Sequence, residues 1–404
     1  MRDDQQTTAV QDLRTWTDHG DPARFPFESV AAALQRTGKH VPDRHLIALL
    51  AGVRDRLPRH GNGLLERFLH VVLDKHDGRY ANPTYLALDL LPIAWRDQPT
   101  PDPAQAARQR DRVVVLLLAD ALRFELDAAE GRHDLSPEMR PNVRLLGKRC
   151  RHGLRAARPA LARLGLDGGA AVADPVDAAR RMCRAVEADA TPAERRMLAL
   201  TVLPVSRVHD ERLFLRVLQA YELTFAAMAV SLQAAIADVG AGRTSGAARR
   251  VGDAERQLRE AAPLFSLIGT MQPEAFLTFR QSTDGASAIQ SRSYKLLESL
   301  CRRPDAERLD SPAYRSVPEV RERVLAGQAD LDAAVAAAGG AAEVAAAMAG
   351  LEDALGAWRR THHSLAVKML GARRGTGATA GVPYLAAARE IPVFSAAAPA
   401  LQAA

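Results

Sequence analysis

The chain has 404 residues, of which 47% are hydrophobic and 25% are charged, as in an ordinary soluble globular protein. These values exclude a largely disordered chain, a collagen-like chain and a small scaffold held by disulfides. The longest apolar run, residues 113–119, is far shorter than the roughly 20 residues that span a bilayer. The polar start shows no secretory signal and the three cysteines are far apart, so we expect a cytoplasmic protein without a membrane segment.

The basic residues, which give a net charge of +6, raise the question of nucleic-acid binding. They concentrate in residues 140–166, a stretch without Asp or Glu. No aromatic residue there offers a stacking platform for bases. We therefore interpret the stretch as a solvated or inter-subunit face and expect no nucleic-acid partner, with nucleic-acid binding kept only as a minor alternative. Five of its basic residues recur at helical spacing: Arg144, Lys148, Arg151, Arg155 and Arg158.

Helical periodicity dominates the first half of the chain. The run 112–126 begins with β-branched residues like a buried strand, but it continues with helix formers and favours a buried helix. Residues 97–103 form a Pro-rich linker, and a Thr-Pro pair opens a helix near 192. We expect helices over 44–57, 64–73, 85–91, 112–126, 176–188 and 192–203.

The second half is more regular and contains longer helical patterns. No segment alternates with a period of two for long enough to predict a strand, so the fold class is all-α. Because residues 395–404 are rich in alanine, we expect a loose tail. The expected helices are 210–239, 247–271, 274–280, 286–301, 316–337 and 341–371.

A histidine lies within the apolar face of the last long helix. His362 continues a stripe at spacings of three and four residues that includes Leu355, Trp358 and Leu365. One interpretation is a core histidine that is hydrogen-bonded to a neighbour. The other is an axial haem ligand, because haem iron takes a neutral imidazole from an apolar wall. In that case Trp358 packs along the flat cofactor and Arg359 reaches an acidic group at its rim.

An arginine lies beside aromatic residues in the expected helix 274–280. Phe276 and Arg280 share a helix face, with Phe279 adjacent. A guanidinium binds a carboxylate while rings hold a flat apolar group, which is what an aromatic amino acid requires. The alternative is a surface ion pair beside a core phenylalanine. The glycine-rich segment 375–381 is a loop but not a P-loop, and helix capping is sufficient to explain Asp210 and Glu211.

Four segments in this order resemble the tryptophan 2,3-dioxygenase family of haem enzymes. They are YLALD (85–89), HDERLFLRVLQAYEL (209–223), FLTFRQSTDGASAIQS (276–291) and WRRTHHSLAVKMLGARRGTGATAGVPYL (358–385). The resemblance implies an all-α helical bundle of that type with an N-terminal helical extension and a large insertion. The implied parts are an extension (1–78), a family N-terminal segment (79–94), a helical insertion (95–204), a haem-binding oxygenase core (205–395) and a tail (396–404).

The resemblance also implies a role for individual residues. His362 would be the proximal ligand of haem b, with Trp358, Arg359 and Lys295 near the haem, Lys295 replacing an arginine. Arg280 would bind the substrate carboxylate. Ser287 and Thr376 would contact the haem edge or the amino-acid backbone of the substrate. Tyr85 would come from an N-terminal segment, with a neighbouring subunit as one source, and the distal pocket would be lined by Phe214, Phe276 and Phe279.

Three departures from the family pattern fall in segments that would face the active site. The family's distal histidine is Leu218 here, and leucine neither accepts a proton nor hydrogen-bonds to bound oxygen. Ala288 and Ile289 replace a glycine and a phenylalanine, and the loop 375–381 is altered. These changes indicate a changed substrate or a changed chemistry.

The sequence therefore predicts a haem oxygenase that acts on L-tryptophan or a related aromatic amino acid derivative in secondary metabolism. Molecular oxygen or peroxide would be the oxidant, and a homodimer or homotetramer is expected. A monooxygenase or an oxidative-rearrangement enzyme for a modified tryptophan or tyrosine is one alternative. A non-catalytic haem or ligand sensor is the other.

Overall fold

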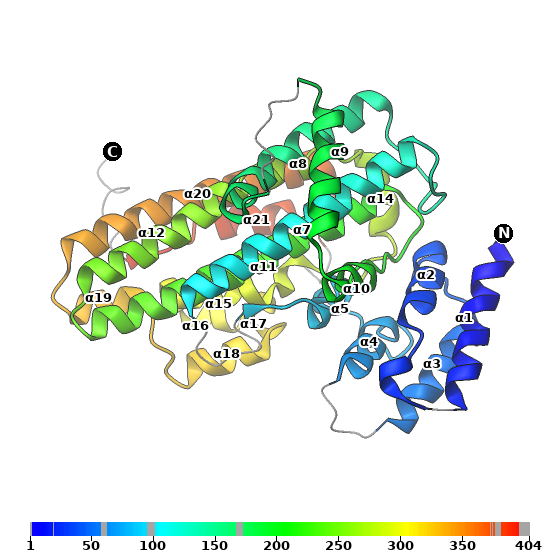
Figure 1. Cartoon of the computed structure of the whole chain (residues 1–404). Coiled ribbons are helices and arrows are strands. Elements are labelled where there is room, and N and C mark those ends of the chain that lie inside the picture. Colours follow the sequence, from blue (N-terminus) through cyan, green and yellow to red (C-terminus); the bar gives the residue numbers. More distant parts are fainter. Residues whose placement is uncertain are drawn as a thin grey trace.

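Helices joined by short turns make up most of this computed structural model, which describes residues 2–18, 20–57, 63–94, 102–166, 173–371, 373, 375 and 381–395. Within these ranges there is no β-sheet, and one isolated bridge pairs Glu138 with Val208. The predicted all-α fold is confirmed (Figure 1).

The N-terminal helices form most of a second hydrophobic core, to which Leu200 and Leu203 also belong. Its centre is a set of edge-to-face rings, with Phe27 4.9 Å from Phe25 and 5.3 Å from Phe68 between centroids. The expected single helix 85–91 is wrong, because a left-handed residue, Ala87, separates two short pieces. The elements are α1 (Arg2–Thr17), η1 (Pro22–Arg24), α2 (Phe27–Thr37), α3 (Arg44–Arg56), α4 (Leu64–Val72), α5 (Asn82–Tyr85) and η2 (Leu88–Leu90).

Four helices follow before the central part of the molecule. The run 112–126 lies inside a buried helix, as predicted, and Thr191 forms a capping box with Glu194 at the start of the last of the four. Gly153 allows the second helix to approach Leu122 of the first, since an added Cβ would lie 2.8 Å from the leucine Cδ1. The helices are α7 (Pro103–Ala129), α8 (Val143–Leu164), α9 (Pro175–Asp189) and α10 (Pro192–Leu200).

A long apolar helix, α11 (Asp210–Gly240), runs through the centre and packs against α7, α12 and α15 (Figure 1). By length and composition alone it would pass as a membrane span. Of its most apolar window, 72% is buried inside the protein, so the core accounts for its hydrophobicity. The remaining elements are α12 (Thr244–Ala261), α13 (Pro263–Ile268), α14 (Pro273–Arg280), η3 (Ala288–Gln290), α15 (Arg292–Cys301), α16 (Ala306–Leu309), α17 (Pro312–Arg315), α18 (Pro318–Leu325), α19 (Leu331–Ala337), α20 (Ala342–Leu370) and α21 (Val382–Arg389).

Three expected helices are interrupted in the structure. The expected helix 247–271 breaks at Pro263, which has no N–H to continue the ladder and starts α13. The expected helix 286–301 breaks at Ser291, whose side chain caps α15. The expected helix 316–337 breaks near Gly327, which has a φ of 89°.

Asp210, the first residue of α11, does more than cap the helix. Its carboxylate is fully buried, 2.6 Å from Arg149 of α8, and it accepts a hydrogen bond from the Gln272 backbone N–H at 2.8 Å. Arg149 also pairs with Glu125 of α7 at 2.7 Å. The expectation that capping alone explains Asp210 is therefore wrong, because the carboxylate ties three segments together.

Candidate active site

A large cavity lies between α11, α14, α15, α20 and α21, with residues 82–86 on one side. The empty space between its walls is about 1780 Å³, including its open mouth. Most of the residues singled out from the sequence meet here, although they come from distant parts of the chain. They are Tyr85, Phe214, Leu218, Phe276, Phe279, Arg280, Ser287, Lys295, Trp358, Arg359 and His362.

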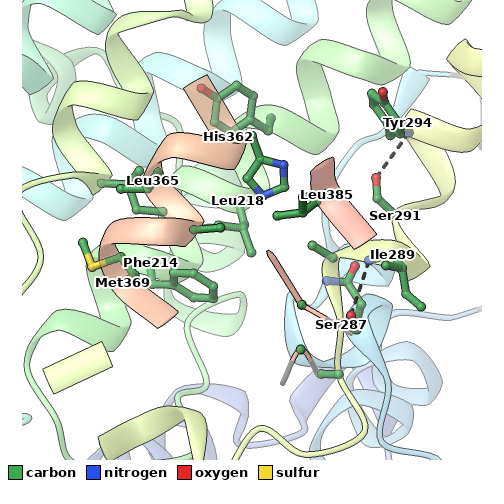
Figure 2. A pocket seen from close by; sticks show the side chains of 18 of the residues that line it. Phe214, Leu218, Ser287, Ile289, Ser291, Tyr294, His362, Leu365, Met369 and Leu385 are labelled. Atoms are coloured by element: carbon green, nitrogen blue, oxygen red, sulfur yellow. Dashed lines mark hydrogen bonds between the residues drawn. The ribbon is translucent and has the colours of Figure 1, made fainter. Parts of the chain in front are cut away.

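One face of α11 forms a long wall of the cavity. Phe214, Leu218, Tyr221, Glu222 and Phe225 follow at spacings of three, four or one residues and all border the space. From the first to the last of them the helix rises roughly 16 Å. Leu218 is partly exposed in the middle of this wall and presents only methyl groups to the cavity (Figure 2).

His362 projects into the cavity from α20, opposite that wall (Figure 2). Its ring lies 6.1 Å from the Phe265 ring in a stacked arrangement and 5.1 Å from the Trp358 ring. Burial, with a smaller effect of the neighbouring His363, lowers the pKa of His362 to about 4. Within the described chain the imidazole has no hydrogen-bond partner, so a neutral ring with an available lone pair faces the cavity.

Trp358 belongs to a cluster of flat side chains beside His362. Its ring stacks on Tyr294 at 5.2 Å and meets Phe225 edge-to-face at 5.4 Å. Among the described residues the indole Nε1 of Trp358 has no acceptor. The cluster gives this end of the cavity an apolar, aromatic wall.

Three cations surround one buried carboxylate at the same end. Lys295 and Arg308 each lie 3.0 Å from Glu298, and Arg359 lies 3.6 Å from it. Burial acts to raise the pKa of Glu298, but the three cations outweigh it and lower the pKa to about 2. Burial lowers the pKa of Lys295 to about 8. The group keeps an excess of positive charge beside the cavity, which suits an acidic ligand group. Sequence reasoning missed Arg308 and Glu298, although Glu298 lies one helical turn after Lys295.

The other end of the cavity combines a guanidinium with phenyl rings. Phe214 lies 5.8 Å from Phe276 and 5.3 Å from Phe279, between ring centroids. Arg280, on the same short helix as the last two, also borders the cavity. Burial lowers the pKa of Arg280 below its ordinary value, and the nearby Asp284 opposes this shift. The predicted grouping of Arg280 with aromatic rings is present.

Tyr85 borders the cavity of its own chain. Its ring lies 6.5 Å from Phe214, and its hydroxyl donates to Glu211 Oε1 at 3.2 Å. Glu211 is fully buried and also accepts hydrogen bonds from the backbone N–H groups of Val205 and Ser206 at 2.7 and 2.9 Å. Burial raises the pKa of Glu211 to about 7, although these donors act to lower it. Capping therefore does not explain Glu211, which holds Tyr85 in place.

The segment that carries Tyr85 is fixed to the loop opposite by a shared acceptor. The side-chain Oε1 of Gln290 accepts from the backbone N–H of Asn82 at 2.9 Å and from that of Ser287 at 3.0 Å. Lys75 adds a bond from its Nζ to the Ser282 carbonyl at 2.9 Å. These contacts place Ser287 and Ile289 at the cavity (Figure 2).

One predicted site residue, Thr376, lies outside the described residues, together with the rest of 376–380. The two flanking glycines, Gly375 and Gly381, are described and border the cavity. His209, the nearest histidine to Leu218 on the N-terminal side, faces away from the cavity. Its ring is fully buried, 3.2 Å from Glu125, and stacks on Phe124.

Comparisons with known proteins point to the same family as the motifs. The profile of the family described as tryptophan 2,3-dioxygenase matches residues 190–325, which include α11, Arg280 and Lys295. A protein named tryptophan 2,3-dioxygenase from Polaromonas sp. strain JS666 is 26% identical over 232 residues, covering 47% of this chain and 79% of the relative. Those of Anaeromyxobacter dehalogenans and Ruegeria pomeroyi are 27% and 29% identical, covering 47% and 49% of this chain and 86% of each relative. By sequence the chain is similar to the tryptophan 2,3-dioxygenase family, at low identity.

Proposed function

We propose that this chain is a haem b-dependent oxygenase that acts on L-tryptophan or a related aromatic amino acid derivative, in secondary metabolism. The observation that carries the proposal is one cavity with His362 at one wall and Arg280 among phenyl rings at another. The relatives named tryptophan 2,3-dioxygenase support it, since the chain covers most of their length. The chain would act in the cytoplasm, with molecular oxygen or peroxide as the co-substrate.

The residues at the His362 end fit a haem. The neutral imidazole of His362 would be the ligand that the protein supplies to the haem iron, since the porphyrin supplies four nitrogen ligands of its own. The aromatic wall around Trp358 suits a flat macrocycle, and the cations Lys295, Arg308 and Arg359 suit its acidic groups. Haem bound there would supply the redox chemistry that activates oxygen.

The residues at the Arg280 end fit an aromatic amino acid. The guanidinium would hold the substrate carboxylate through paired hydrogen bonds, and Phe214, Phe276 and Phe279 would hold the aromatic ring. Ser287 and, in the adjoining loop, Thr376 would contact the amino-acid backbone. Tyr85 would cover this end and exclude water from the bound substrate.

Leu218 favours a change of chemistry as the second candidate. Its side chain can neither take a proton from a ring N–H nor donate to bound oxygen. Proton movement in the cavity must therefore use the substrate or another group. Insertion of one oxygen atom, or an oxidative rearrangement of a modified tryptophan or tyrosine, is the alternative that this residue supports. A non-catalytic haem or ligand sensor is less well supported, because a haem sensor needs no amino-acid clamp such as Arg280.

We also propose a role for each part of the chain. Residues 205–395 would form the oxygenase core, with 79–94 as the segment that closes the cavity. Residues 1–78 would be an extension that forms most of the second hydrophobic core, and 95–204 an insertion that packs on α11. The expected homodimer or homotetramer remains a prediction for sedimentation measurements.

The first test is the visible spectrum of the purified chain after haem is added. We expect a Soret band in the parent protein and its loss or a strong shift in His362→Ala, because the axial nitrogen is removed. His363→Ala is the matched control, since it removes the adjacent imidazole and should leave the band in place. If His362→Ala binds haem as the parent does, the axial assignment is wrong.

A further inference from the structure

One face of α8 carries a row of five exposed cations that lies apart from the cavity. Arg144, Lys148, Arg151, Arg155 and Arg158 follow at spacings of four, three, four and three residues. We call this row the basic stripe. A helix brings residues at such spacings onto one side, so the basic stripe is continuous over roughly 21 Å. It lies outside the segment that matches the dioxygenase family profile.

Among the residues that the structure describes, no carboxylate neutralises the basic stripe. Within the described chain none of its five side chains forms an ion pair or a hydrogen bond, although other arginines of α8 do. Arg149 is buried between two carboxylates, and Arg163 pairs with Asp111 and Glu260 at 2.6 and 2.7 Å. The helix therefore pairs the buried Arg149 and the partly exposed Arg163, whereas its outward row has no carboxylate partner among the described residues.

Two further observations mark this face. Beside the N-terminal end of the basic stripe, Val143 is 80% exposed and Met139 is 39% exposed, and both belong to the few large apolar residues that are exposed in the described part of the chain. Exposed apolar groups next to charges are typical of interaction surfaces. The pKa of His152, which lies within the row, is lowered by burial and then by Arg151, Arg155 and Lys148, which indicates a positive local field.

We propose that the basic stripe docks an acidic α-helix of a partner protein. Carboxylates at spacings of three and four residues on such a helix repeat every 5–6 Å or so, the interval of the cations. Arginine is the favoured partner because its planar guanidinium binds a carboxylate through two hydrogen bonds. An apolar residue near the end of the partner helix would cover Val143 and Met139.

Other occupants match the surface less well. Nucleic acid would satisfy the charges, but the basic stripe has no aromatic side chain for base stacking, and a phosphate backbone offers nothing apolar to Val143. A second copy of this chain in a twofold contact centred on the basic stripe would place two identical basic stripes against each other, which is repulsive.

The test measures fluorescence anisotropy of a labelled helical peptide of about 21 residues, with glutamates at spacings of three and four and a leucine near one end. A scrambled peptide of the same composition and a single-stranded DNA of equal charge serve as comparison probes. At about 0.1 M salt we expect the full chain to bind the patterned peptide at least about tenfold more tightly than either comparison probe.

The matched variants carry the same change of charge at different places. Lys148→Glu, Arg151→Glu and Arg155→Glu combined should weaken binding of the patterned peptide by about tenfold or more. Arg44→Glu, Arg56→Glu and Arg323→Glu combined, at exposed positions on α3 and α18, should change it by less than about threefold. Undetectable binding of the patterned peptide, equal binding of the scrambled peptide, tighter binding of DNA, or equal losses in both variants would each overturn the proposal.

Discussion

A few side chains decide what the cavity can bind. His362 is neutral because apolar and aromatic groups surround it, whereas Arg280 stays charged because its ordinary pKa is so high. Leu218 lies in the wall between them and contributes only shape. At this scale the sequence is informative, since helical spacing alone predicts that His362 and Trp358 share one face of the helix.

Removing the guanidinium should weaken binding of an aromatic amino acid. We expect Arg280→Ala to weaken the binding free energy of tryptophan by about 2 kcal/mol, the scale of a lost charge-assisted contact. Spectral titration of the haem-loaded chain measures it, with Arg315→Ala at an exposed position on α17 as the control. An unchanged titration for Arg280→Ala would contradict the proposal that Arg280 binds the substrate carboxylate.

The pH dependence of stability should report on Glu211. Its pKa in the folded chain is about 7, above the ordinary 4.5, so the folded state binds this proton more tightly than the unfolded state does. The stabilisation that protonated Glu211 adds to the free energy of unfolding is complete below about pH 4.5. It is lost as the pH rises to about 7, a change on the order of 3 kcal/mol.

The comparison is between urea unfolding at pH 5 and at pH 8. Glu211→Gln cannot ionise, so its free energy of unfolding should change less between the two values than that of the parent. Glu322→Gln, at an exposed position on α18, should behave like the parent. Parallel profiles for the parent and Glu211→Gln would mean that this carboxyl does not titrate in the window.

Among the elements, the long helices were predictable and their breaks were not. The apolar stripes of α11 and α20 repeat so regularly that both were expected to within two residues of their bounds. The breaks at Pro263 and Ser291 were missed because apolar spacing continues across them, and only the local proline and cap geometry ends the helix. The cation cluster around Glu298 was missed because Lys295, Arg308 and Arg359 lie on three separate elements.

The contact between α7 and α8 should be sensitive to one methyl group. Gly153→Ala would place a Cβ 2.8 Å from Leu122 Cδ1 in a fully buried site, so we expect a loss of about 1–3 kcal/mol in the free energy of unfolding. Gly252→Ala on α12 is the control. Its Cβ would meet nothing within 4 Å, so the change should stabilise the helix by up to about 1 kcal/mol. Equal effects of the two substitutions would show that α7 and α8 do not pack closely.

At the scale of the whole molecule, the structure shows which parts of the long chain build the cavity and where its basic residues lie. The cavity residues come from residue 82 onward, while the first four helices form most of a second hydrophobic core. The positive charge is partly internal, as at Arg149 and around Glu298, and partly the exposed stripe on α8. Composition alone could not separate these, because burial of an arginine depends on carboxylates brought close by the fold.

The most direct test of the central claim is the mass of the product formed from tryptophan by the haem-loaded chain. The reaction is supplied with a reductant and oxygen gas enriched in the heavy isotope of oxygen. We predict a product that contains labelled oxygen, with two labelled atoms for a dioxygenase and one for the alternative chemistry favoured by Leu218. If neither tryptophan nor substituted tryptophans and tyrosines gain labelled oxygen or shift the haem spectrum, the chain is not an oxygenase of aromatic amino acids.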